Sequence, residues 1–304
     1  MASTKTDNEN SPTAQPSLIS EIVALSKPRV IELLITTALP AMFLAARDYP
    51  EPIRIFGVLI GGTLAAGSSN AINSILEKDI DTNMNRTKNR PMAQNRLSPK
   101  FAWSFAVLAQ IASFLIVAFT CNLVAALFTL LASFVYVFIY TIWLKPRTDQ
   151  NIVIGGAAGA LPAIIGYSAI TGTLNWQALT MFLIIFLWTP AHFWALATFH
   201  EEDYRRGGFP MMPITQGKRK TSFAILTYSI ATFLASLILN IDKDLGYIYL
   251  GTAIVLGIWF IFEASVLSRG HATIHRGRYM RFFHVSNAYL AILFIAIAVD
   301  AVVG

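Results

Sequence analysis

The chain has 304 residues, of which 55% are hydrophobic and only 13% carry a charge. Soluble domains carry about 25% charged residues, so this composition excludes an ordinary soluble protein and indicates a polytopic membrane protein. The net charge of +6 does not indicate nucleic-acid binding, because the basic residues lie in short loops between apolar segments. Cys121 is the only cysteine, which excludes an internal disulfide and a cysteine-based metal site.

The N-terminal segment is polar and contains Asp7 and Glu9. It has neither the apolar core of a secretory signal nor the arginine run of a mitochondrial transit peptide. We therefore expect residues 1–25 to form a disordered polar tail. Residues 26–304 are expected to form one membrane domain, inserted by its first apolar span.

Nine apolar windows are long enough to cross a bilayer, which takes about 20 residues in a helix. They lie at roughly 30–46, 54–76, 101–120, 122–143, 151–170, 176–198, 222–240, 246–266 and 283–302. The sequence therefore predicts an all-α fold with nine transmembrane helices. Small-residue runs such as Gly61–Gly67 and Gly155–Ala160 allow such helices to approach closely.

The lysines and arginines are distributed unevenly between the loops on the two sides of this bundle. Of the 23 basic residues, only Arg47, Arg54 and Lys243 fall in one set of loops, and the remaining 20 fall in the other set. Cytoplasmic loops carry such an excess of basic residues. The distribution therefore predicts a cytoplasmic N-terminus, an external C-terminus, and a cytoplasmic position for the polar motifs described next.

The stretch from Asn73 to Pro91 is an island of charge in this apolar sequence. Side-chain oxygens recur in it every four residues, at Asn73, Glu77, Asp81 and Asn85, and basic residues follow at Arg86, Lys88 and Arg90. On a continuous helix the oxygens would form one stripe. A site that holds a hard cation together with a polyanion such as a diphosphate needs this combination. The alternative, a solvated loop whose charges only fix topology, does not explain the spacing.

A second span ends in a similar way. Residues 188–194 are Trp-Thr-Pro-Ala-His-Phe-Trp, and the following loop contains His200, Glu201, Glu202, Asp203, Tyr204, Arg205 and Arg206. Again carboxylates are followed almost directly by arginines. Two such helix ends, four spans apart, suggest two halves of a bundle that face each other across one cavity.

These motifs resemble those of a known family. The series Asn73, Glu77 and Asp81, continuing through Met84–Pro91, resembles the first acidic motif of the UbiA superfamily of intramembrane prenyltransferases. Segments 140–145, 150–160, 188–196 and 202–206 resemble, more narrowly, the protohaem IX farnesyltransferase branch of that superfamily. The resemblance covers the chain from about Ser26 to its end.

The resemblance implies a nine-helix bundle that transfers the farnesyl group of farnesyl diphosphate, with addition of water, to a vinyl group of haem b, giving haem O. Mg²⁺ would be the cofactor, as a Lewis acid that bridges carboxylates and phosphate oxygens. The expected catalytic residues are Glu77, Asp81 and Asp203 as metal ligands and Asn73 as an orienting residue. Basic residues are expected to bind the diphosphate, as the arginine fork matches phosphate oxygens: Arg86, Lys88, Arg90, Lys145, Arg205 and Arg206.

The second motif departs from the superfamily, which usually has an aspartate where this chain has His192. Imidazole is a common axial ligand of haem iron, so the departure is consistent with a haem-binding residue. The alternative is a buried, hydrogen-bonded packing residue. His284, at the start of the last span, is the next candidate for haem binding, whereas His200, His271 and His275 are expected to be polar loop residues.

Three other functions are alternatives to haem farnesylation. A prenyltransferase acting on an aromatic quinone precursor differs only in the acceptor. A secondary transporter would place ionisable groups near the bilayer midplane, and a non-catalytic assembly factor would not need the stripe of carboxylates. We expect a bacterial plasma-membrane enzyme with its active site on the cytoplasmic side, and a downstream haem-modifying enzyme or terminal oxidase as a partner.

Overall fold

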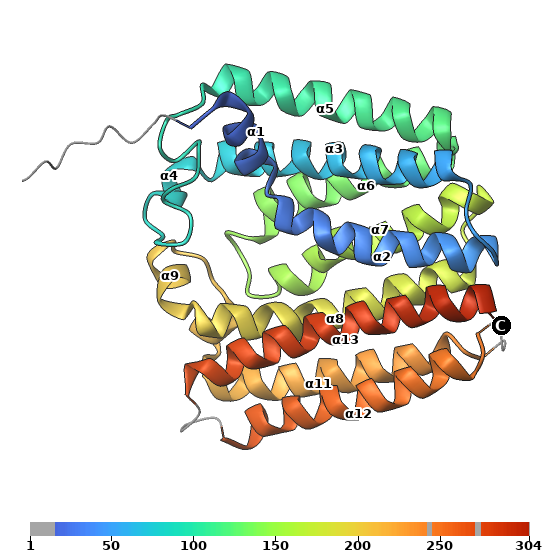
Figure 1. Cartoon of the computed structure of the whole chain (residues 1–304). Coiled ribbons are helices and arrows are strands. Elements are labelled where there is room, and N and C mark those ends of the chain that lie inside the picture. Colours follow the sequence, from blue (N-terminus) through green and yellow to red (C-terminus); the bar gives the residue numbers. More distant parts are fainter. Residues whose placement is uncertain (1–15, 242–244, 271–274, 304) are drawn as a thin grey trace, which may run out of the picture.

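The computed structural model describes residues 16–241, 245–270 and 275–303, and within these ranges the chain forms helices and no strand. In chain order the helices are α1 (Leu18–Ser26), α2 (Pro28–Ala46), α3 (Pro52–Leu76), α4 (Lys78–Asp81), α5 (Pro99–Thr120), α6 (Leu123–Phe134), η1 (Val135–Leu144), α7 (Asn151–Thr171), α8 (Trp176–Phe199), α9 (Glu201–Arg206), α10 (Met212–Thr215), α11 (Gly217–Ile238), α12 (Tyr247–Gly270) and α13 (Arg276–Val303). The long helices pack side by side in one bundle (Figure 1).

Eight helices of the described chain are long and apolar enough to cross a membrane, with α6 and η1 forming one continuous span. They correspond to eight of the nine windows. The remaining window corresponds to α2, whose apolar part is the shorter stretch Ile35–Ala46. Even so, α2 packs along α7 and α13, and its 19 residues extend about 28 Å at 1.5 Å per residue. The chain is therefore a multi-pass helical membrane protein.

Helix α1 lies within the segment that was expected to be a disordered tail. Its first turn is capped by Ser17, whose hydroxyl accepts a hydrogen bond from the backbone N–H of Ser20 at 3.2 Å. Leu25 is buried against α3 and α5, and Glu21 pairs with Arg96 at 2.6 Å. Because this helix has both a buried side chain and an ion pair, the expectation of disorder does not hold for residues 18–25. Residues 1–15 lie outside the described chain.

Small residues set the spacing of several helix pairs, at Gly61 inside a predicted small-residue run and at Gly166 outside the two predicted runs. A Cβ atom at Gly166 of α7 would collide with the backbone carbonyl of Ala38 on α2, and one at Gly61 of α3 would collide with Val117 on α5. Such close backbone approaches provide the dispersion contacts that hold helices together in lipid.

The short helices and long loops gather at one end of the bundle, where Figure 1 shows α1, α4 and α9. We call this the polar end. At the opposite end, Arg54 donates to the carbonyls of Ala169 and Ile170 at 3.1 and 3.0 Å, which caps α7. There Asp300 also accepts the backbone N–H of Tyr249 at 2.9 Å. Charges at that end therefore serve to satisfy helix termini.

The close contact between α2 and α7 leads to a stability prediction. Gly166→Ala should lower the free energy of unfolding by roughly 1–3 kcal/mol, because the Ala38 carbonyl cannot move without separating the two helices. Gly159→Ala, on the same helix, is the matched control, since a Cβ atom there meets open space. Thermal unfolding of both variants in detergent is the measurement. Equal midpoints for the two variants would contradict this packing account.

Candidate functional site

Asn73, Glu77 and Asp81 lie together at the polar end, with only 2%, 6% and 2% of their surface exposed. Helix α3 ends at Leu76, but the backbone N–H groups of Glu77 and Asp81 still bond the carbonyls four residues earlier, at 3.0 and 2.8 Å. The four-residue spacing therefore survives the break between α3 and α4. The chain turns away after Asp81, and Asn85, the fourth member of the predicted stripe, is exposed.

Each of these three side chains has a basic partner. Lys145 pairs with Glu77 at 2.5 Å. Arg90 donates to both carboxylate oxygens of Asp81, at 2.9 and 2.8 Å, and Lys27 donates to the amide oxygen of Asn73 at 2.6 Å. We call this group the charge cluster: Lys27, Asn73, Glu77, Asp81, Arg90 and Lys145. Three cations against two carboxylates leave a formal excess of one positive charge, which favours binding of an anion.

Lys27 is the member of the charge cluster that sequence reasoning missed, because it was considered only for its effect on topology. It ends α1 in a left-handed conformation, with φ of 53°, directly before Pro28, which restricts the preceding residue. Burial holds the pKa of Lys27 well below its usual range, and the nearby Arg90 adds to this effect. The sequence feature that could have pointed to Lys27 is its position directly before Pro28, at the start of the first apolar window.

Asp203, on α9, joins the second polar motif to the first. Its two carboxylate oxygens accept the backbone N–H groups of Asn85 and Arg86, at 3.4 and 3.1 Å. The guanidinium of Arg86 lies over the ring of Tyr204, 5.7 Å from the centroid. The loops after α3 and α8, which are far apart in sequence, therefore meet at the polar end.

Of the six residues predicted to bind the diphosphate, only Arg90 and Lys145 belong to the charge cluster. Lys88 is exposed and donates to the side-chain oxygen of Asn85 at 3.3 Å. Arg205 and Arg206 are also exposed, and each pairs with a glutamate one turn earlier in α9, at 2.9 and 3.6 Å. These three residues surround the buried group at the surface and do not contact its carboxylates in this structure.

A hollow of about 480 Å³ lies at the surface of the polar end. It is lined by Arg86, His200, Asp203 and Arg276 among others. The guanidinium of Arg276, on the first residue of α13, donates to the carbonyl of Phe199 and lies over its ring. Sequence reasoning did not select Arg276, which adds a further cation beside the second motif.

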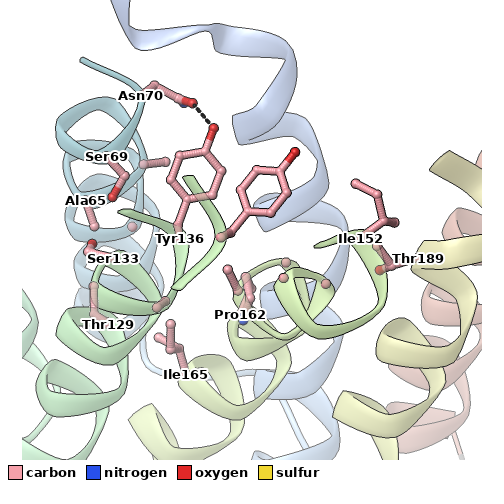
Figure 2. A pocket seen from close by; sticks show the side chains of 18 of the residues that line it. Ala65, Ser69, Asn70, Thr129, Ser133, Tyr136, Ile152, Pro162, Ile165 and Thr189 are labelled. Carbon is pink, nitrogen blue, oxygen red and sulfur yellow. Dashed lines mark hydrogen bonds between the residues drawn. The ribbon is translucent and has the colours of Figure 1, made fainter. Parts of the chain in front are cut away.

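An apolar cavity of about 300 Å³ lies inside the bundle. Glycine, alanine and aromatic side chains of α3, α6, η1, α7 and α8 line most of it. Figure 2 shows the hydroxyl of Tyr136 pointing toward Asn70 at one side of the cavity, where the two side chains are hydrogen-bonded at 3.2 Å. Tyr140 also lines the cavity, and the ammonium group of Lys145 lies 5.8 Å from its ring centroid. The cavity thus adjoins the charge cluster.

The π-helix η1 connects the cavity to the charge cluster. In a π-helix each N–H bonds a carbonyl five residues earlier, and the N–H of Lys145 still bonds the carbonyl of Tyr140 in this way, at 2.8 Å. Thr141, also in η1, accepts a hydrogen bond from the side chain of Asn73 at 3.3 Å. One short helix therefore supplies groups to both the cavity and the charge cluster.

His192 lines the same cavity from α8. Its ring is stacked between Trp188 and Phe283, with centroid distances of 4.1 and 4.4 Å, and its Nδ1 lies 2.6 Å from the hydroxyl oxygen of Ser286. His284 is exposed and is not part of the cavity wall. His275 is exposed too, and His271 lies outside the described residues. Of the two predicted haem-binding residues, only His192 faces the cavity.

No three carboxylate, histidine or cysteine side chains of the described chain are placed to hold a metal ion together. Glu77 and Asp81 face cations, and Asp203 accepts backbone N–H groups. A divalent cation at this site would therefore need ligands that a bound substrate supplies.

The comparisons with known proteins agree with this architecture. Residues 34–287 match the model of the UbiA prenyltransferase family. Protoheme IX farnesyltransferase 1 of Saccharopolyspora erythraea is 45% identical over 96% of this chain and 93% of its own length. The protoheme IX farnesyltransferase of Mycobacterium avium is 45% identical over 96% and 94%.

Solved structures share the fold at low identity. A digeranylgeranylglyceryl phosphate synthase structure superposes with a TM-score of 0.77 at 17% identity, covering 93% of this chain and 98% of that one. A UbiA homologue from Archaeoglobus fulgidus, bound to DMAPP and Mg²⁺, superposes with a TM-score of 0.63 at 15% identity, covering 92% and 99%. The resemblance found in the motifs and the predicted transferase class are thus confirmed. The chain belongs to the UbiA prenyltransferase family.

Proposed function

We propose that the chain transfers the farnesyl group of farnesyl diphosphate, with addition of water, to a vinyl group of haem b, giving haem O. The observation that carries this proposal is the position of the charge cluster beside an apolar cavity, with Lys145 next to the lining residue Tyr140. A prenyl diphosphate has the same division, with a polyanionic head and an apolar tail. The names of the relatives in Saccharopolyspora and Mycobacterium support haem as the acceptor.

The diphosphate would bind at the charge cluster. Lys27, Arg90 and Lys145 supply positive charge in a buried site, where electrostatic interactions are strongest. Arg90 also offers a planar fork that matches two phosphate oxygens. The exposed basic residues at the rim would attract the anion and steer it inward: Arg86, Lys88, Arg205 and Arg206.

Mg²⁺ fits the donors that are present. Carboxylate and amide oxygens are hard ligands, and Mg²⁺ is usually held by one or two carboxylates together with substrate phosphates. Glu77, Asp81 and Asp203 would hold it, directly or through water, with Asn73 orienting them. This requires Lys145 and Arg90 to move from the carboxylates to the phosphate oxygens. Bound in this way, Mg²⁺ would act as a Lewis acid that stabilises the departing diphosphate. The neighbour bound to DMAPP and Mg²⁺ supports this arrangement.

The protein's own residues would protect the reactive intermediate. Breakage of the C–O bond leaves an allylic cation, which must not meet water before the vinyl carbon attacks it. The aromatic residues Tyr136, Tyr140 and Trp188 line the cavity, and their rings would stabilise that cation. Attack of the vinyl group moves the positive charge onto the haem substituent. Water then adds there and releases a proton.

Haem b is expected to enter from the membrane and to lie against His192, with the aromatic quinone precursor as the alternative acceptor. His192 is the histidine of the cavity wall, and imidazole binds haem iron. His284 is exposed and is the weaker candidate. A downstream haem-modifying enzyme or terminal oxidase would receive the product.

The proposed topology has nine transmembrane helices, with α2 as the first, a cytoplasmic N-terminus and an external C-terminus. The long loops at the polar end (Figure 1) contain Arg86, Lys88, Arg90 and Lys145. This supports the topology, because cytoplasmic loops are rich in lysine and arginine. In this topology the charge cluster faces the cytoplasm, which is the source of a soluble diphosphate. We place the enzyme in a bacterial plasma membrane.

The test of the function is product identification by mass spectrometry, using the purified chain, Mg²⁺, farnesyl diphosphate and either haem b or an aromatic quinone precursor. Haem O is the expected product. Asp81→Ala should lower kcat at least about 100-fold, because it removes a group that acts on the departing charge. Asp79→Ala is the matched control, since Asp79 lies in the same short helix but is exposed. Prenylation of the aromatic acceptor alone, or full activity of Asp81→Ala, would refute the proposal.

The affinity of the charge cluster for farnesyl diphosphate should depend on pH through Lys145. Burial lowers the pKa of Lys145, although the neighbouring Glu77 carboxylate opposes part of this effect. As pH rises through that lowered pKa, the ammonium group loses its charge, so the KM for farnesyl diphosphate should begin to rise at a lower pH than the one at which an ordinary lysine titrates. In Lys145→Arg the KM should rise less over this range, because arginine remains charged, and loss of charge from Lys27, whose pKa is also lowered, accounts for the rise that is left. Steady-state kinetics of both proteins provide the comparison, and identical pH profiles would contradict it.

A further inference from the structure

His192 is held on three sides. Its two ring faces are covered by Trp188 and Phe283, at interplanar angles of 21° and 29°. Its Nδ1 points at the hydroxyl of Ser286 on α13, at 2.6 Å. Since His192 also lines the cavity, the ring edge that carries Nε2 is the part left to face it.

Ser286 is itself fixed by two further hydrogen bonds. Its hydroxyl donates to the carbonyl of Phe283 at 2.7 Å, and its backbone carbonyl accepts the indole N–H of Trp188 at 2.8 Å. Ser286 is fully buried. The residues on both faces of the imidazole are thus tied to the same serine, which couples α8 to α13 at this point.

These bonds determine which nitrogen of His192 carries the proton. A serine hydroxyl has one hydrogen, and a carbonyl can only accept, so the contact with Phe283 uses that hydrogen. The 2.6 Å contact between Nδ1 and Ser286 then has a hydrogen only if Nδ1 is the donor. With the other tautomer, two lone pairs would face each other at this distance. The hydrogen-bond network therefore assigns neutral His192 as the Nδ1–H tautomer.

We infer that Ser286 is a positioning residue that holds His192 in the Nδ1–H tautomer and so presents the unprotonated Nε2 to the iron of haem b in the cavity. The inference rests on the proposed function, because it takes haem b as the acceptor. Histidines that bind metals donate their other ring N–H to a fixed acceptor, which sets tautomer and orientation. Here a serine hydroxyl, itself anchored to Phe283, has that role.

Iron ligation would give the acceptor a defined position. The iron lies in the plane of the macrocycle, so a bond to Nε2 fixes one point of the haem relative to α8. The vinyl group must reach the allylic carbon of a prenyl chain whose head is bound at the charge cluster. Ser286 thus acts on the reaction only through His192, and its loss should affect haem before it affects farnesyl diphosphate.

The test begins with the wild-type chain and needs no substrate. The sequence has five histidines, so ¹⁵N-histidine NMR of the full chain in nanodiscs yields few signals, and His192→Gln identifies the one of interest. We expect the Nδ1–H tautomer in wild type and in Ser286→Thr, which keeps the hydroxyl, and the Nε2–H tautomer or a mixture in Ser286→Ala. An Nε2–H tautomer in wild type would overturn the inference.

Haem binding gives the second measurement. Titration of haem b should produce an imidazole-ligated absorption spectrum that His192→Gln removes. Ser286→Ala should weaken haem b binding by 10- to 100-fold, in the range found for such supporting residues, while farnesyl diphosphate affinity stays within twofold and Ser286→Thr restores haem binding. Unchanged haem affinity in Ser286→Ala would overturn the inference, as would an unchanged spectrum in His192→Gln. Expected tautomer and spectrum without haem O formation would instead refute the proposed function alone.

Discussion

Burial of carboxylates at the end of a membrane bundle is the constraint on which this structure depends. Glu77 and Asp81 are almost completely buried, and removal of one partner from such a pair costs roughly 3–5 kcal/mol. Their partners come from other segments, Lys145 from the end of η1 and Arg90 from the loop after α4. The polar end is therefore held together by the groups proposed to bind the substrate.

The same pairing has a consequence for binding. The carboxylates hold the cations in place, yet they also oppose an incoming diphosphate. In the proposed mechanism a metal ion would resolve this conflict, because it would give the carboxylates a new partner when the cations turn to the phosphates. Binding of diphosphate and metal should therefore be coupled. The cavity beside the cluster has Tyr140 and His192 in its wall. Under the proposed function it would determine where the prenyl chain and its acceptor lie.

The sequence predicted the helices well, because each long span is a continuous apolar run that needs no knowledge of its neighbours. It also predicted that Asn73, Glu77 and Asp81 lie together, since a four-residue repeat is local information. Contacts between residues far apart in the sequence were harder to predict. Lys27 is 46 residues from Asn73 and Ser286 is 94 from His192, so no spacing rule connects them. The π-helical path of η1 was not visible either, because its composition is that of an ordinary span. In contrast, the pairing of Arg205 and Arg206 with Glu201 and Glu202 was readable as i, i+4 spacing.

The most direct measurement of the central claim is calorimetric binding of farnesyl diphosphate, with and without Mg²⁺ and without any acceptor, to wild type and Asp81→Asn. Wild type should bind the diphosphate at least about tenfold more tightly with Mg²⁺, and linkage requires the reverse effect of equal size. In Asp81→Asn this factor should fall toward one, while metal-free binding stays as strong or becomes stronger, because Arg90 is released and a repelling charge is gone. Formation of the Mg²⁺–diphosphate complex in solution is common to both proteins and cancels in the comparison. An equal Mg²⁺ effect in both would contradict a site in which buried carboxylates exchange their cations for a metal.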